Sequence, residues 1–327
     1  MAVRREDGAL VTVFGGAGFI GRHVVRELAR QGFRVRVAVR RPDLAGHLQP
    51  MGVVGQIHAV QANVRYPESL AAAVEGAHAV VNLVGILGKT GAQTFDAVHA
   101  QGARAVAKAA KRAGAGTFVQ ISAIGADATS AGHYGRSKAA GEAGVLEEFP
   151  EAVILRPSVV FGPEDTFFNR FARLAKMAPA LPLIGGGRTR FQPVYVGDVA
   201  LAIAAAVNGM ARPGAVYELG GPEVVTFAKL IERTQEWAGR DRRTINLPFG
   251  LAKLIASLTV VLPSGLRPLT VDQVRMLQSD VVVSEQASQD GRTLQGLGIT
   301  APQGMAAIVP AYLEQYRPKG QYSHYRG

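Results

Sequence analysis

The sequence predicts an α/β protein: a Rossmann-type, doubly wound parallel sheet with a smaller, mainly helical C-terminal subdomain. Short apolar runs alternate with stretches of helical periodicity through the first half of the chain, and the first run leads directly into a glycine-rich segment. Near residue 160 this alternation stops. Strands that alternate with helices imply a parallel sheet covered on both faces. We therefore expect a Rossmann domain over residues 1–160 and a smaller subdomain, ending in a partner-binding tail, over residues 161–327.

Apolar periodicity gives the elements in chain order. We expect strands at residues 10–14, 34–39, 57–62, 79–84, 117–121 and 153–155. The helices expected between them lie at residues 19–31, 67–74, 95–113 and 134–149. In the second half we expect a helix at residues 198–207, and residues 216–219 could return to the sheet.

Composition excludes several classes of protein. The chain has no cysteine, which removes disulfides, iron–sulfur ligation and thiol nucleophiles, and we assign no metal site. The formal net charge of +11 favours acidic partners, but the basic residues are dispersed and no nucleic-acid motif is present. The first eight residues are polar, without a signal peptide, and no run approaches the ~20 apolar residues of a membrane span. We expect a soluble or peripheral protein that does not bind nucleic acid.

Gly15, Gly18 and Gly21 have the spacing G-x-x-G-x-x-G between the first strand and the first helix, which Phe19 and Ile20 open. In a dinucleotide site the first glycine permits a tight turn, the second admits a pyrophosphate, and the third lets helix pack on strand. The helix N-terminus then offers free N–H groups to the phosphates. The alternative is a plain turn, but the flanking strand and helix favour cofactor binding.

Arg40 and Arg41 end the second strand, where a site selective for NAD usually has a carboxylate for the ribose 2′-hydroxyl. Guanidinium groups suit a 2′-phosphate instead, so we expect NADP(H), with NAD(H) as the alternative. If the two arginines are ordinary solvated side chains, this preference has no basis.

Residues that follow other strands complete the predicted nucleotide site. Asn63 could reach the adenine edge, although a simple turn asparagine explains it almost equally well. Gly85 would let the backbone pass close to the cofactor, although a tight turn explains it too. The remaining residues assigned to this site are Val64, Val84, Pro157 and Val160.

Ser122 ends a strand, and Tyr134 and Lys138 are four residues apart, so they share one helix face. This is the arrangement of a proton-transfer site, because a nearby ammonium lowers the pKa of a phenol and a serine can orient a carbonyl or hydroxyl. The three residues could also hold only the nicotinamide ribose, without turnover.

Together these features resemble the short-chain dehydrogenase/reductase superfamily, in its extended or atypical branch. Further segments resemble one group within it, the nucleotide-binding accessory subunit of respiratory complex I (NADH:ubiquinone oxidoreductase). They are QISAIGA at 120–126, LRPSVVFGPED at 155–165, RFQPVYVGDVA at 190–200 and YRPKGQY at 316–322. The match covers nearly the whole chain, and its second half is the specific part.

The resemblance implies a tightly bound NADPH that is held away from the electron path and a role in assembly or stabilisation. It implies core subunits of the quinone module and the adjacent membrane arm as partners. It implies a peripheral position on the cytoplasmic face of a bacterial inner membrane or the matrix face of the mitochondrial one, and the absence of a presequence favours the bacterial location. Two residues depart from the superfamily pattern: Asn63 replaces an acidic residue near adenine, and His99 replaces a common asparagine.

Two functions of different kinds follow. The first is a complex I subunit in which NADPH is structural, and the match beyond the cofactor residues favours it. The second is a free-standing NADP-dependent short-chain dehydrogenase/reductase, epimerase or dehydratase, in which Tyr134 is the acid or base, Lys138 tunes it and Ser122 positions substrate.

The stretch 247–262 is strongly apolar but too short and interrupted to span a bilayer. It is either a buried helix of the smaller subdomain or an interfacial element that docks on a membrane subunit or an anionic lipid surface. In the second case, the basic run 240–243 would face anionic headgroups, and Lys253 could extend toward water from the apolar surface.

Overall fold

The computed structural model describes residues 8–258 and 270–318. The chain divides into two compact units, each made of segments that are distant in sequence. The first unit comprises residues 1–157, 196–219 and 283–300, and the second comprises residues 158–195, 220–282 and 301–327. Each unit has its own hydrophobic core, so each is described by itself.

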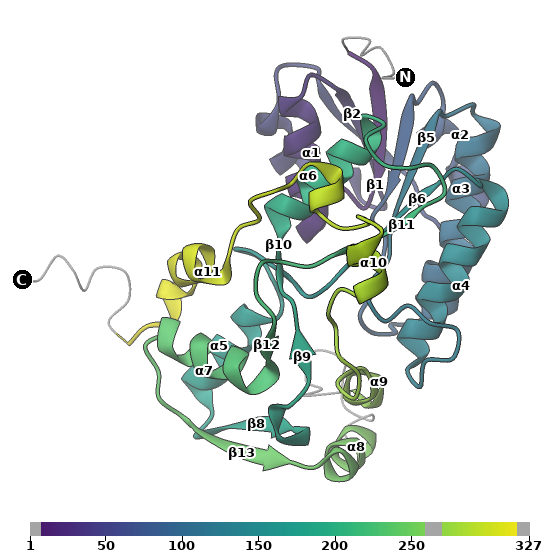
Figure 1. The fold of residues 1–327 in the computed structure, drawn as a ribbon. Coiled ribbons are helices and arrows are strands. Elements are labelled where there is room, and N and C mark those ends of the chain that lie inside the picture. The colour runs from purple at the N-terminus through teal and green to yellow at the C-terminus, as the bar shows by residue number, and fades with distance from the viewer. Residues whose placement is uncertain (1–7, 259–269, 319–327) are drawn as a thin grey trace, which may run out of the picture. The chain divides into compact units, whose positions relative to one another are not determined.

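The first unit is built on a seven-stranded sheet in which every pairing is parallel (Figure 1). Its strand order is β11-β6-β5-β4-β1-β2-β3. The chain therefore builds outward from β1 in one direction, returns to β4 and builds outward in the other, which confirms the predicted doubly wound sheet. The strands are β1 (Leu10–Phe14), β2 (Arg34–Val39), β3 (Ile57–Gln61), β4 (Ala79–Asn82), β5 (Thr117–Ile121), β6 (Val153–Pro157) and β11 (Val216–Leu219).

Helices cover both faces of this sheet. On one face α1 packs against α6, and on the other α3 packs against α4 (Figure 1). Buried Phe118 of β5 contacts Phe149, which follows α4, with ring centroids 5.6 Å apart. The helices of the unit are α1 (Phe19–Arg30), α2 (Ala71–Val74), α3 (Ala103–Arg112), α4 (His133–Glu148), α6 (Val196–Val207) and α10 (Glu285–Gln289).

Two stretches of the first unit differ from regular α-helix. The predicted helix at 95–113 begins as a π-helix, η3 (Asp96–Gly102), before it continues as α3. The stretch η1 (Pro42–Met51), for which no element is predicted, is 3₁₀-helical, with a proline at its first position and another inside it. Pro50, inside the stretch, lacks the N–H that a regular α-helix needs.

In its described residues the second unit is mainly helical, and it also contains three pairs of strands that were not predicted. The strands are β7 (Val160–Phe161) with β10 (Val194–Tyr195), β8 (Ala180–Ile184) with β13 (Arg243–Leu247), and β9 (Arg190–Phe191) with β12 (Val225–Thr226). The helices are α5 (Phe168–Met177), α7 (Phe227–Trp237), α8 (Phe249–Leu258), α9 (Val271–Met276) and α11 (Met305–Leu313). Strands of two residues are too short to show periodicity.

Asp165 connects two helices of the second unit. Its buried carboxylate accepts the backbone N–H groups of Gly162 and Phe168, and it accepts the hydroxyl of Tyr312 from α11. Burial raises the pKa of Asp165 although these donors oppose it. The carboxylate thus caps the start of α5 and attaches α11 to it, which gives the segment at 162–165 a structural role.

We predict that Gly21→Ala lowers the free energy of unfolding by about 2–3 kcal/mol, because overpacking forces backbone shifts. The new Cβ would lie 2.3 Å from the carbonyl oxygen of Gly15 and 2.6 Å from the Cα of Gly16. Alanine is otherwise the better helix former, so the clash reverses the sign of the usual effect. The control is Gly18→Ala, whose Cβ meets only Gly15 O, at 3.3 Å. Urea unfolding measures both, and a Gly21→Ala protein as stable as wild type would show that α1 does not depend on this contact.

Candidate functional site

A short loop joins β1 to α1 at the carboxyl edge of the sheet. Gly15 has φ +77°, in the left-handed region that favours glycine. Its N–H donates to the carbonyl of Ala38 on β2 (3.1 Å), and the N–H of Gly18 donates back to the carbonyl of Gly15 (3.0 Å). The loop is therefore a tight turn closed against the end of β2.

The N-terminus of α1 is open to a ligand. Gly18 is the residue before the helix, no side chain caps it, and the first turn contains no acidic residue. An added Cβ on Gly18 would meet nothing but Gly15 O within 4 Å. The N–H groups of Phe19, Ile20 and Gly21 lie in the first turn, where amides have no acceptor within the helix and the helix dipole is positive. These features fit a phosphate group.

The two arginines at the end of β2 differ in their partners. Nη1 of Arg40 donates to Oε1 of Gln93 (2.7 Å), a neutral acceptor. Arg41 instead makes an ion pair with Asp43, with Nη2 2.7 Å from Oδ2. The sequence places no carboxylate at the end of β2, but Asp43, a few residues beyond that end, supplies one to Arg41. The structure therefore leaves Arg40 as the better of the two candidates for an incoming anion.

The residues after β3 and β4 are held by local contacts. Oδ1 of Asn63 accepts the N–H of Arg65 (3.2 Å), so the side chain forms the turn that was the alternative to adenine binding. Val64 is buried in the core beside α3. The N–H of Val84 donates to Oδ1 of Asn82 (3.2 Å). Asn63 and the backbone N–H of Val84 are therefore held by local contacts, and Val64 belongs to the core.

A buried row of amide groups crosses the ends of β4 and β5. Nδ2 of Asn82 donates to Oε1 of Gln120 (2.9 Å), and Nε2 of Gln120 donates to the carbonyl of Ile121 (2.8 Å). The same carbonyl accepts Nζ of Lys138 from α4 (3.3 Å). This connection was not predicted, although a polar residue at the same register in two buried strands was a usable signal.

Ser122 comes directly after Ile121. Its Oγ is buried and has no hydrogen-bond partner among the residues that the structure describes. Buried hydroxyls are almost always hydrogen-bonded, so this atom indicates an external acceptor or donor. Nζ of Lys138 lies 5.9 Å from the ring centroid of Tyr134. Lys138 thus contacts the residue before Ser122 and lies over the ring of Tyr134.

The ionisation of this group differs from the prediction for the phenol. Burial raises the pKa of Tyr134 to about 12, so the expected lowering by a nearby ammonium is wrong. The cost of burying a phenolate outweighs the attraction of an ammonium that lies over the ring and is bonded to a carbonyl. Burial also lowers the pKa of Lys138 to about 8, and the charge of Glu142 opposes that shift. At neutral pH Tyr134 is a hydrogen-bond donor or an acid, and it is not a base.

Glu142 also connects α4 to β6. Its carboxylate accepts Nε and Nη2 of Arg156 at 2.9 and 2.5 Å, which is a two-point ion pair. Pro157 ends β6, and its carbonyl accepts the N–H of Ile124 (3.0 Å). Val160 lies in β7, where it pairs with Val194, and it is the one residue assigned to the site that belongs to the second unit.

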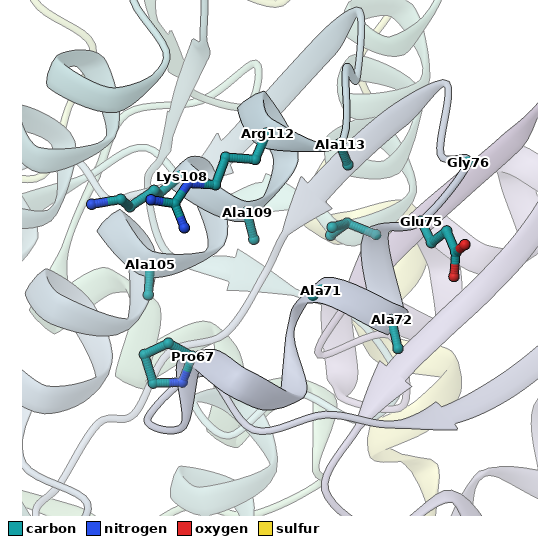
Figure 2. A pocket seen from close by; sticks show the side chains of 11 residues that line it. Pro67, Ala71, Ala72, Glu75, Gly76, Ala105, Lys108, Ala109, Arg112 and Ala113 are labelled. Carbon is teal, nitrogen blue, oxygen red and sulfur yellow. The ribbon is translucent and has the colours of Figure 1, made fainter.

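The hollow in Figure 2 is separate from this site. It is open, has a volume of about 770 Å³ and lies between α2 and α3. Glu75, Gly76 and Ala113 on its wall precede β4 and β5, so it belongs to the amino edge of the sheet, opposite the loop at 15–18. Five of its eleven lining residues are alanines, Lys108 and Arg112 also line it, and none of the eleven is a residue that we assign to the site.

Across residues 8–258 and 270–318 no three His, Asp or Glu side chains gather as a metal site would require. In the same ranges no helix has both the length and the apolar character to cross a membrane.

Comparison with known proteins agrees with this geometry. The model of the NAD dependent epimerase/dehydratase family matches residues 11–220. The chain is 36% identical to NADH dehydrogenase (ubiquinone) 1 alpha subcomplex subunit 9, mitochondrial, of Arabidopsis thaliana, over 96% of this chain and 79% of that protein. It is 34% identical to the ceramide reductase of Caulobacter vibrioides over 60% of each chain.

Among solved structures, the dTDP-glucose 4,6-dehydratase DesIV from Streptomyces venezuelae, determined with NAD and TYD bound, has the same fold. Its TM-score is 0.70 at 21% identity, covering 94% of this chain and 96% of the other. The family model supports a nicotinamide cofactor. The chain thus belongs to the NAD dependent epimerase/dehydratase family and, within it, to the family of the alpha subcomplex subunit 9 of NADH dehydrogenase (ubiquinone), as its sequence motifs predicted.

Proposed function

We propose that this chain is an NADPH-binding accessory subunit of respiratory complex I, in which the nucleotide is structural and supports assembly near the quinone region. The observation that carries the proposal is the extent of the likeness to the alpha subcomplex subunit, which continues through the second unit. A likeness that reflected cofactor binding alone would be concentrated in the first unit, where all but one of the assigned site residues lie.

The residues of the first unit fit the proposed nucleotide. The open N-terminus of α1 would bind the pyrophosphate, and the unpartnered Oγ of Ser122, with Tyr134 and Lys138, would hold the nicotinamide ribose. A bound nicotinamide dinucleotide can supply or accept a hydride. The neutral phenol and the ammonium can donate hydrogen bonds to hydroxyl oxygens without any proton transfer, which suits a structural role.

The surface of α8 supports a peripheral position. Ala252 and Ala256 are buried, whereas Leu251, Leu254 and Leu258 are 48%, 56% and 67% exposed. The prediction of a buried helix is therefore wrong for this face, because the alanine side is the one that packs. Leu247 belongs to β13, and residues 259–262 of the stretch lie outside the described residues. We propose that the leucine face docks on the membrane arm or on anionic lipid, on the cytoplasmic side in bacteria or the matrix side in mitochondria.

The basic run before β13 contributes less to such docking than its sequence suggests. Arg240 donates to the carbonyl of Tyr316, and Arg242 donates to the carbonyl of Ala175. Both guanidinium groups therefore stabilise the second unit, and Arg243, on the exposed β13, is better placed to meet an anionic surface.

A second candidate function is a free-standing NADP-dependent reductase, epimerase or dehydratase. The likeness to the ceramide reductase and the unpartnered Oγ of Ser122 favour it. In that case Tyr134 would donate a proton to a carbonyl oxygen as an acid, Lys138 would hold the substrate or ribose, and Ser122 would orient the carbonyl.

We predict that the wild-type chain binds NADPH more tightly than NADH and that Arg40→Ala weakens NADPH about tenfold while leaving NADH unchanged. A charged hydrogen bond of roughly 1.5 kcal/mol, the low end for an exposed group, gives that factor. Arg41→Ala should have less effect because Asp43 already holds Arg41, and Asp43→Ala should tighten NADPH by releasing it. Calorimetry measures the affinities of the wild type and the three variants for NADPH and for NADH. Equal affinities of the wild type for the two nucleotides would refute the preference.

Tyr134→Phe separates the two functions. For the subunit we expect nearly unchanged NADPH occupancy and nearly unchanged quinone-reductase activity of the parent complex, because the ring still packs. For the enzyme, loss of a proton donor costs ~10²–10⁴-fold in rate. The assay compares NADPH content and both activities, with Gly18→Val as the control that should empty the site. A fall of that size in an NADPH-dependent reductase activity would establish the second candidate.

The isolated chain should co-sediment with anionic liposomes at low salt and less so at high salt, because charge and apolar burial both contribute. Leu254→Asp should weaken sedimentation without changing the unfolding of the first unit. The matched control is Leu44→Asp, which changes a leucine of similar exposure (64%) in the first unit and should sediment like wild type. A wild type that ignores liposomes would assign docking to protein partners alone, and a Leu254→Asp chain that unfolds would assign α8 to the core.

A further inference from the structure

His99 lies in the π-helix η3, and its backbone is in direct contact with α4. A Cβ added to Gly141 of α4 would lie 2.1 Å from the carbonyl oxygen of His99, so only glycine permits this approach. A π-turn inserts a residue into the helix and often occurs at functional sites. Here it places an imidazole that is 3% exposed between α4 and the segment that follows β4.

Hydrogen bonds define the protonation of this imidazole. The N–H of Ile86 donates to Nε2 of His99 (3.0 Å), so Nε2 must be an acceptor. Nδ1, which lies 3.0 Å from Oγ of Ser137, then carries the proton and donates it. Oγ of Ser137 donates in turn to the carbonyl of Tyr134 (2.8 Å). A single neutral imidazole therefore joins the segment after β4 to the first turn of α4.

Packing and charge keep the imidazole in this form. Phe95 stacks on it with a centroid separation of 5.4 Å, and the ring of Tyr134 meets it edge-on at 5.3 Å. Burial, together with the charge of Lys138, lowers the pKa of His99 to about 3. His99 therefore accepts the Ile86 N–H throughout the physiological pH range.

The segment held by His99 borders the predicted ribose site. A Cβ on Gly85 would lie 3.5 Å from Nζ of Lys138 and 3.6 Å from Nε2 of His99. We propose that His99 is a positioning residue that fixes Gly85 and Ile86 against α4 and so sets the opening in which Tyr134 and Lys138 hold the nicotinamide half of the nucleotide. The nucleotide part of this inference rests on the proposed function, whereas the anchoring of Ile86 does not.

Three substitutions of His99 separate its two hydrogen bonds. His99→Gln places an amide near the position of Nε2 and can still accept from Ile86, whereas His99→Asn reaches only the position of Nδ1. His99→Phe keeps an aromatic ring and loses both bonds. His58→Asn, on the exposed face of β3, is the matched control. Residue-resolved hydrogen exchange of the Ile86 amide is measured on nucleotide-free protein, and NADPH affinity is measured on the same proteins.

We expect Ile86 to exchange about tenfold faster in the Asn and Phe variants and NADPH affinity to fall about tenfold, the equivalent of one neutral hydrogen bond of ~1.4 kcal/mol. The Gln variant should keep both the exchange rate of the Ile86 amide and the NADPH affinity near their wild-type values. A role of His99 in packing alone would not predict this result. Amides of β2 should exchange at the wild-type rate if the variants fold. Equal behaviour of Gln and Asn, or an unchanged Ile86 amide in the Phe variant, would overturn the proposal. A wild type that protects Ile86 but binds no nucleotide would refute the proposed function and leave the anchoring intact.

Discussion

A parallel sheet forces all of its strands to end at the same edge, and the candidate site depends on this constraint. Because the order of strands reverses between β1 and β4, the connections that leave these two strands diverge and leave the carboxyl edge open between them. Gly21 lets the first turn of α1 approach Gly15 and Gly16 closely at this edge. The glycine motif, the arginines after β2 and the serine after β5 come to the same edge of the sheet only through this topology.

Polar contacts at the edge are nearly complete, and that determines what a ligand can do there. The side chain of Asn82 donates a hydrogen bond to that of Gln120 across β4 and β5, and Lys138 donates to the carbonyl of Ile121. His99 satisfies the N–H of Ile86. Oγ of Ser122 is the exception in the described part of this network. Leaving a buried hydroxyl without a hydrogen-bond partner costs ~1–3 kcal/mol of free energy. A ligand that bonds to this hydroxyl therefore gains affinity, because the side chain is already held in place and need not be ordered on binding.

Much of the first unit could be predicted because local signals and tertiary structure agree there. The strands β1, β2, β5 and β11 have the predicted bounds, and the glycine spacing located the turn and the helix. Ser122, Tyr134 and Lys138 could be proposed as site residues because strand ends and a four-residue spacing are visible in a sequence. The short strand pairs of the second unit could not be predicted in this way, because their pairing depends on contacts between residues that are distant in sequence.

Other features depend on burial and ion pairing, which the pattern of residues in the sequence does not show. The pKa of Tyr134 depends on how deeply the phenol is buried, and Arg41 is neutralised by Asp43, a neighbour that a strand-end rule overlooks. The π-turn that places His99 resembles ordinary helix in its periodicity. The leucines of α8 look like core because apolarity does not say which face of a helix packs, and in this chain the alanine face does.

The central claim is that the chain works as a part of a larger respiratory enzyme, and one purification tests it most directly. The full chain, tagged and expressed at its native level, is isolated in mild detergent and its co-purifying proteins are identified by mass spectrometry. The account predicts subunits of the quinone module and the adjacent membrane arm of NADH:ubiquinone oxidoreductase in constant proportion to the chain. A chain that purifies alone, from cells in which that complex is intact, would contradict it.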